Sequence, residues 1–194
     1  MVFMQRLIEK GIVNLNDLMS TVHYEVEKRA NLKLENVLPP ESKLKRVYGG
    51  TDTYFALDPK FLRVRNMMLI RPHISHIQKV CEKEIVDYGV VKESEADIQD
   101  AQYTIGFLTE SEGKPKVIID GWRKEYLLGD LTVCVDDIEG LGPWTEIEKV
   151  TKSKEENSEA LREVIEAFES LGVKENQLTS ELYPTILYKK QHAK

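Results

Sequence analysis

The sequence predicts an α+β protein built around an antiparallel sheet or barrel. About seven or eight short segments have the residue pattern of strands, and turns short enough for hairpins join most of them. Only two or three segments have helical periodicity. A chain of 194 residues suits one domain with a sizeable core. An eight-stranded closed barrel has an interior that can hold one small ligand.

The elements begin with a helical lead-in over residues 1–20, with a turn near Gly11. Residues Lys33–Lys45 are mostly polar, and Pro39 and Pro40 exclude a continuous helix there. The strand segments share alternation or enrichment in β-branched and aromatic residues. They are predicted at Tyr24–Ala30, Thr51–Phe55, Phe61–Met68, His73–Val80, Ile85–Ile98, Val117–Leu128, Leu131–Asp136 and Trp144–Val150, with Leu182–Leu187 as a last short strand or hooked segment.

Turns and helix ends complete this order of elements. The turns are predicted from glycine and proline pairs at Gly49–Gly50, Asp58–Pro59, Gly129–Asp130 and the corner Gly140–Pro143. One helix is predicted at Asp100–Glu112, with Asp100 as its N-cap. Another is predicted at Ser153–Leu171, because Ser153 and Glu156 have the capping-box spacing and apolar residues recur at helical intervals.

The composition excludes several classes of protein. A formal net charge of -6 counts against a general nucleic-acid binder, although a basic cavity inside an acidic shell could still bind a phosphate compound. Two distant cysteines, Cys81 and Cys134, do not make a disulfide framework or a zinc site, and they suit a reducing cytoplasmic location. No apolar run approaches the roughly 18 residues needed to span a membrane. Met1–Ile12 carries charged residues and makes a poor signal peptide.

Charged residues recur at every second position on several predicted strands, so each group shares one face of its strand. These groups are Glu25, Glu27 and Arg29; Arg63 and Arg65; Glu93, Glu95 and Asp97; and Glu146 and Glu148. On any one strand, charges exposed to water would explain the pattern. Four such strands together favour one concave surface for a metal-bound polyphosphate. Its acids would coordinate Mg²⁺ or Mn²⁺, and its arginines would contact phosphate oxygens.

Several motifs occur in the order found in a known family. They are Glu25-Val-Glu27-Lys-Arg29, Thr51–Phe55, Leu62-Arg63-Val64-Arg65, the acids Glu93, Glu95 and Asp97, Trp122-Arg123-Lys124-Glu125-Tyr126, Asp136-Asp137-Ile-Glu-Gly-Leu-Gly-Pro-Trp-Thr-Glu146-Ile-Glu148, and the tyrosine-containing end Ser180–Leu187. With these motifs, from about Tyr24 to Leu187, the chain resembles the CYTH superfamily. This superfamily, also called triphosphate tunnel metalloenzymes, includes class IV adenylyl cyclases and thiamine triphosphatases.

The resemblance implies an eight-stranded antiparallel β-barrel, or tunnel, with helices packed outside. Residues 1–22 would form an N-terminal helical extension and residues 23–190 a single tunnel domain. The residues implied to hold Mg²⁺ or Mn²⁺ are Glu25, Glu27, Glu93, Glu95, Asp136, Glu146 and Glu148. The residues implied to bind the substrate are Arg29, Arg63, Arg65, Lys79 and Arg123, and of these Arg29 and Lys79 are also implied to be catalytic.

The implied activity is metal-dependent processing of a triphosphate. The Gly140–Gly142 corner resembles the class IV cyclase branch, which converts ATP to cyclic AMP and diphosphate. The alternatives are an inorganic or thiamine triphosphatase that releases orthophosphate, and a non-catalytic nucleotide- or polyphosphate-binding protein. The expected partner is a nucleotide or another triphosphate, with no nucleic acid and no membrane, and a homodimer is left open.

Overall fold

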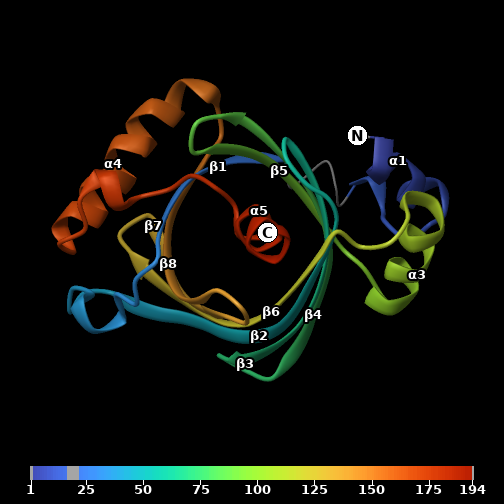
Figure 1. The fold of residues 1–194 in the computed structure, drawn as a ribbon, viewed down its shortest axis with the longest axis horizontal. Helices are drawn as coiled ribbons and strands as arrows, with labels where there is room; N and C mark the ends of the chain where they lie inside the picture. Colours follow the sequence, from blue (N-terminus) through green and yellow to red (C-terminus); the bar gives the residue numbers. More distant parts are fainter. Residues whose placement is uncertain (1, 17–21, 194) are drawn as a thin grey trace.

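Eight antiparallel strands close into a barrel in the computed structural model, which describes residues 2–16 and 22–193 (Figure 1). The strands are β1 His23–Ala30, β2 Lys43–Ala56, β3 Lys60–Arg71, β4 Ser75–Asp87, β5 Val90–Asp97, β6 Val117–Leu128, β7 Leu131–Ile138 and β8 Gly142–Thr151. Their hydrogen-bonded order is β1-β5-β4-β3-β2-β6-β7-β8, and pairing of β8 with β1 closes the ring. The predicted fold class is confirmed.

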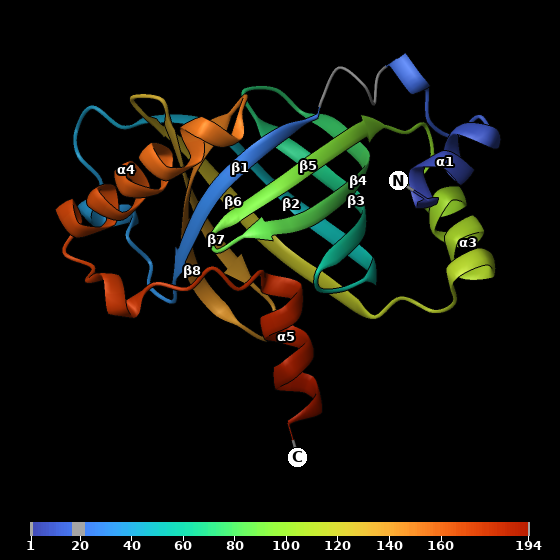
Figure 2. The same cartoon turned by 90° about the horizontal axis from the view of Figure 1, so that it is seen from above.

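Helices surround this barrel. The α-helices are α1 Val2–Glu9, α3 Ala101–Glu112, α4 Asn157–Ser170 and α5 Tyr183–His192, and the short 3-10 helices are η1 Glu35–Val37, η2 Lys154–Glu156 and η3 Glu175–Gln177. Helix α4 lies over β1 and β8, whereas α1 and α3 lie together on the opposite side (Figures 1 and 2). The predicted lead-in helix therefore includes α1, but residues 17–21 lie outside the described part. Within the described ranges, no helix has both the length and the apolar character to cross a membrane.

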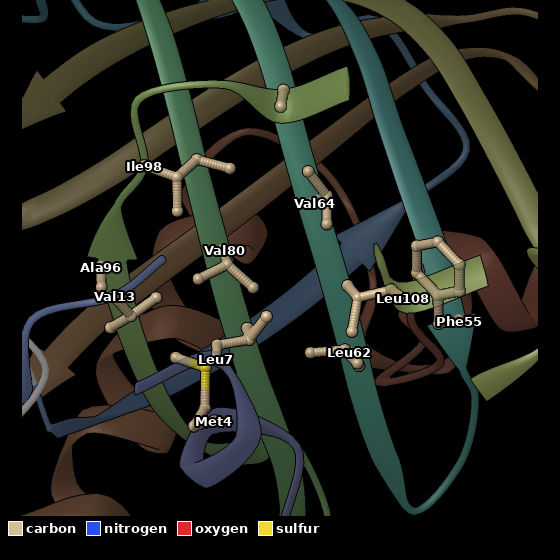
Figure 3. Packing of buried hydrophobic residues seen from close by; sticks show 11 residues of the cluster. Met4, Leu7, Val13, Phe55, Leu62, Val64, Val80, Ala96, Ile98 and Leu108 are labelled. Carbon is tan, nitrogen blue, oxygen red and sulfur yellow. The ribbon is translucent and has the colours of Figure 1, made fainter. Parts of the chain in front are cut away.

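The outer faces of the strands are apolar and form the core with the helices. Met4 and Leu7 of α1 pack with Leu62 of β3 and Val80 of β4, and Leu108 of α3 joins the same cluster (Figure 3). A second cluster contains Ile147 of β8 and Val164 and Phe168 of α4. Because side chains alternate between the two faces of a strand, this outward apolar packing leaves the intervening polar residues inside the barrel.

Helix α5 closes one end of the barrel. Leu182, Tyr183 and Leu187 are buried in one cluster with Phe61 of β3 and Trp144 of β8. Figure 2 shows α5 at one end of the barrel with the C-terminus pointing away from it. The prediction of a strand or hooked segment at Leu182–Leu187 is wrong, because Pro184 lies in the first helical turn, where proline needs no N–H and favours helix initiation.

Strand β2 runs without interruption through Gly49 and Gly50, so the predicted turn there is wrong. A Cβ atom on Gly49 would lie 2.5 Å from the Trp122 ring, and a Cβ on Gly50 would lie 2.5 Å from the backbone oxygen of Asn66. These glycines let neighbouring strands approach closely and do not reverse the chain. The reversal that the prediction missed occurs inside Ile85–Ile98, where Gly89 has φ +75° between β4 and β5.

The helix starts are partly as predicted. The Asp100 carboxylate caps α3 by accepting a hydrogen bond from the Tyr103 backbone N–H at 2.9 Å, which confirms the predicted N-cap. The capping box at Ser153 does not form. Residues Lys154–Glu156 make the 3-10 turn η2, and the Glu156 carboxylate accepts from the Lys152 backbone N–H at 3.1 Å. That bond ties the turn to the end of β8.

Replacement of Gly50 by alanine is expected to lower the free energy of unfolding by about 1–3 kcal/mol, because the new methyl group would overlap the backbone of β3 at a φ of +146°. Gly106 is the matched control. A Cβ at this helical position meets nothing within 4 Å, so Gly106→Ala should stabilise the protein by roughly 0.5–1 kcal/mol. Chemical denaturation of both variants measures the difference, and equal effects would contradict the close approach of β2 to β3.

Candidate functional site

The interior of the barrel is a charged cavity of about 300 Å³. It is lined by all the predicted site residues except Glu27, namely Glu25, Arg29, Arg63, Arg65, Lys79, Glu93, Glu95, Arg123, Asp136, Glu146 and Glu148. Apolar residues that alternate with these charges along the same strands are buried in the outer clusters, namely Val26, Leu62, Val64 and Ile147. Leu182, Tyr183 and Pro184 also line the cavity, so it reaches the end that α5 occupies.

Three glutamates on two adjoining strands form an acidic cluster on one wall. Glu25 and Glu27 of β1 and Glu148 of β8 each offer a carboxylate oxygen within 4.8 Å of the others. Glu27 is 1 % exposed and forms an ion pair with Arg29 at 2.8 Å. Within the described ranges, the Glu148 carboxylate takes part in no hydrogen bond or ion pair. This wall therefore holds more negative charge than its immediate neighbours neutralise.

The pKa values of these acids reflect that excess. Removal from water, followed by repulsion from Glu25 and Glu146, raises the pKa of Glu148 well above its ordinary value. Removal from water, followed by repulsion from Glu93, also raises the pKa of Glu25. Clustered carboxylate oxygens are the ligands that Mg²⁺ and Mn²⁺ prefer. The acidic cluster of Glu25, Glu27 and Glu148 therefore fits a divalent cation, which would remove the repulsion.

The affinity of the protein for Mg²⁺ is expected to increase with pH above about 4.5, the ordinary pKa of glutamate, until the raised pKa of Glu148 has been passed. The sign follows from linkage. Between the ordinary pKa of glutamate and the raised pKa of Glu148, the folded protein keeps a proton on Glu148 that the unfolded chain has lost. The free energy of unfolding of the metal-free protein therefore falls as pH rises through this range. Titration calorimetry in buffers of different ionisation enthalpy should detect proton release on binding. An affinity that does not change with pH would contradict the prediction.

The facing wall carries arginines from β3. Arg65 donates two hydrogen bonds to Asp52 of β2, from Nε to Oδ1 at 2.9 Å and from Nη2 to Oδ2 at 2.7 Å. Arg63 lies 3.4 Å from Glu93 and 3.8 Å from Asp52, and its Nε makes no hydrogen bond. Although burial opposes it, these anions and the nearby Cys81 and Tyr54 hold the pKa of Arg63 well above its ordinary value. Arg63 therefore stays charged at the wall of the cavity.

A second cationic group lies toward α5. Arg29 contacts Glu146 at 2.5 Å, and Arg123 contacts Asp136 at 2.6 Å and Glu146 at 3.1 Å. Although burial opposes it, Arg123 and Arg29 lower the pKa of Glu146 to about 2. The Tyr183 hydroxyl donates to Asp136 at 2.9 Å. Two of the predicted metal ligands, Asp136 and Glu146, are thus paired with arginines in this structure.

Two residues that organise the cavity, Lys83 and Asp52, were not predicted from the sequence. Lys83 of β4 lies 2.5 Å from both Glu25 and Glu93, whereas Lys79 lies 2.5 Å from Glu95. Although burial opposes it, Lys83 holds the pKa of Glu93 well below its ordinary value. Asp52 is the second missed residue. The spacing of Lys79 and Lys83, four positions apart on one strand face, was the available signal for Lys83.

A closed antiparallel barrel whose interior is lined by carboxylates together with arginines and lysines defines a β-tunnel protein with a charged interior. The model of the CYTH domain matches residues 24–183, and the chain belongs to the CYTH family. The resemblance to the CYTH superfamily that the sequence motifs indicated is therefore confirmed. A search among curated proteins finds no match.

Several solved structures of similar fold align with this chain over nearly their whole length. A protein of Pyrococcus horikoshii OT3 aligns with a TM-score of 0.76 and 22 % identity over 86 % of this chain and 99 % of its own. A conserved hypothetical protein of Pyrococcus furiosus gives 0.70 and 27 % over 83 % and 98 %. A candidate adenylate cyclase of Vibrio parahaemolyticus gives 0.68 and 14 % over 84 % and 97 %. These similarities establish the shared tunnel fold.

Proposed function

We propose that this protein is a divalent-metal-dependent enzyme that acts on a triphosphate, with the conversion of ATP to cyclic AMP and diphosphate as its reaction. One observation carries the proposal: Glu25 and Glu148, which form an acidic cluster with Glu27, line the same cavity as Arg63 and Arg65. A chain of phosphates bound to a divalent cation complements such walls, because the cation needs oxygen ligands and the phosphates need bidentate donors.

In this proposal Glu25, Glu27 and Glu148 hold Mg²⁺ or Mn²⁺, which would supply charge neutralisation at the phosphate oxygens. Arg63 and Arg65 bind the phosphates from the facing wall, together with Arg29, Lys79 and Arg123. The remaining predicted ligands, Glu93, Glu95, Asp136 and Glu146, are paired with arginine or lysine, as Glu25 is with Lys83 and Glu27 with Arg29. Phosphate oxygens that take over those cations would free the carboxylates to complete the ligand set.

Hydrolysis is the second candidate, because the predominantly charged lining of the cavity admits water beside the acidic cluster. It would release orthophosphate from inorganic or thiamine triphosphate. Cyclisation and hydrolysis use the same groups, since both depend mainly on positioning and charge neutralisation. They differ in the nucleophile, which is the ribose 3′-hydroxyl in one reaction and water in the other.

Incubation with ATP, tripolyphosphate or thiamine triphosphate, each with Mg²⁺ or Mn²⁺, tests the proposal. Cyclic AMP with diphosphate is the expected product, and orthophosphate would identify a triphosphatase instead. Tight binding without turnover would overturn the enzymatic role in favour of a nucleotide or polyphosphate sensor. Chelation by EDTA should stop either reaction, and turnover that persists in EDTA would contradict metal dependence.

A further inference from the structure

The segment that leads into α5 contacts Arg29 of β1 twice. Thr179 pairs with Arg29 in an isolated antiparallel bridge, in which the backbone N–H of each residue donates to the carbonyl oxygen of the other at 2.9 Å. Further along the segment, the face of the Tyr183 ring lies against the Arg29 guanidinium, with 5.0 Å between Cζ and the ring centroid. The C-terminal end of the chain therefore holds both the backbone and the side chain of this arginine.

The Tyr183 side chain is itself fixed at both its polar and its apolar parts. Tyr183 is the first residue of α5 and is buried. Its hydroxyl donates to Asp136 of β7 at 2.9 Å, and its ring meets the Trp144 ring edge-on, with 5.7 Å between the centroids. A ring held in this way is a rigid support for a guanidinium, because an aromatic face attracts a cation more strongly where water is excluded.

The Arg29 guanidinium has ion pairs at one nitrogen only. Nη2 lies 2.8 Å from Glu27 and 2.5 Å from Glu146, whereas the buried Nε and Nη1 make no hydrogen bond within the part of the chain that the structure describes. A guanidinium paired at one nitrogen can pivot about that nitrogen. The ring that packs on its face therefore determines the direction of its other donors.

We infer that Tyr183 is a positioning residue, whose ring orients the Arg29 guanidinium toward a ligand in the cavity. The inference rests on the proposed function, in which that ligand is a chain of phosphates. Arg29 lines the cavity, and phosphate oxygens accept hydrogen bonds from a guanidinium in pairs only when its plane has the right direction. Helix α5 thus contributes to the site through Arg29, as well as covering one end of the barrel.

A double-mutant cycle tests this inference by binding alone. Calorimetry with Mg²⁺ measures the affinities for tripolyphosphate and for a non-hydrolysable ATP analogue. Tyr183→Leu removes the ring, and we expect about a tenfold loss of affinity for each ligand that the wild type binds. In an Arg29→Lys background, which keeps the charge but lacks the planar guanidinium, the same change should cost less than about twofold. An equal loss in both backgrounds would overturn the inference, because Tyr183 would then not act through Arg29.

Two further variants separate the ring from general packing. Tyr183→Phe keeps the ring and loses only the hydroxyl, so it should recover most of the affinity that Tyr183→Leu loses. Tyr188→Leu is the matched control on the same helix, because Tyr188 is 37 % exposed and stacks on His192, and it should leave both affinities unchanged. If Tyr183→Leu does not fold, Tyr183→Met, which keeps more of the buried volume without an aromatic face, takes its place in the cycle.

The outcomes separate this inference from the proposed function. If the wild type binds either ligand and Tyr183→Leu keeps full affinity for it, the role of Tyr183 is overturned and the triphosphate site stands. A Tyr183→Phe variant that binds as weakly as Tyr183→Leu also overturns that role, because the ring would then not be the part that matters. If the wild type binds neither ligand, both the inference and the proposed function fail.

Discussion

Replacement of Glu148 by glutamine is expected to reduce metal-dependent turnover by about a hundred- to a thousandfold, the loss typical of removing one electrostatic stabiliser from an active site. Glutamine keeps the shape of the side chain but removes the anionic oxygen that a divalent cation needs. The same change should raise the thermal stability of the metal-free protein, because it removes the repulsion that Glu25 and Glu146 exert on Glu148.

This opposite movement of activity and stability distinguishes a ligand from a structural residue. Thermal unfolding in EDTA and steady-state turnover in Mg²⁺ measure the two effects. Glu84→Gln is the matched control, because Glu84 lies on the outward face of β4 with 47 % of its side chain exposed and should change neither quantity. If the Glu148→Gln variant binds the metal ion as the wild type does, Glu148 is not one of the metal ligands.

Replacement of Arg63 by alanine is expected to weaken triphosphate binding by about tenfold to a hundredfold, the range for hydrogen bonds that involve a charged group. The fold should tolerate the change, because each carboxylate beside Arg63 keeps another cation. Asp52 retains both hydrogen bonds from Arg65, and Glu93 retains Lys83 at 2.5 Å. The guanidinium of Arg63 is thus more important for a ligand than for the empty barrel.

Competition binding and thermal unfolding without ligand measure these two effects for Arg63→Ala. Arg162→Ala on the outer face of α4, where the arginine side chain is 56 % exposed, serves as control and should leave the affinity unchanged. If Arg63→Ala loses stability without ligand in proportion to its lost affinity, Arg63 supports the barrel wall instead of the phosphates.

Local patterns were enough to predict most of the charged side chains that line the cavity, with Glu27, Lys83 and Asp52 among the exceptions. The alternation at Glu25, Glu27 and Arg29 places these charges on one face of β1 whatever the neighbouring strand is. The contacts among the charges were less accessible, because they depend on register across the barrel. Lys83 reaches Glu93 because these residues are opposite each other on β4 and β5. No spacing within either strand contains that information.

The end of the chain shows another limit of local patterns. Leu182–Leu187 is too short for its periodicity to separate a strand from a helix. The helix forms where Tyr183 and Leu187, one turn apart, can be buried together against the open end of the barrel. Gly49 and Gly50 are a related case, since paired glycines mark both turns and close strand contacts. Tertiary packing decides between these outcomes.

The position of α5 at one end of the barrel has a kinetic consequence for the proposed reaction. Because α5 covers one end of the barrel, the substrate of the proposed reaction would enter and its products would leave through the other end. The fragment that lies deepest must leave after the one in front of it, so departure is sequential, and the last fragment competes directly with the next incoming molecule. Accumulated end product should therefore slow the enzyme in a manner that additional substrate overcomes.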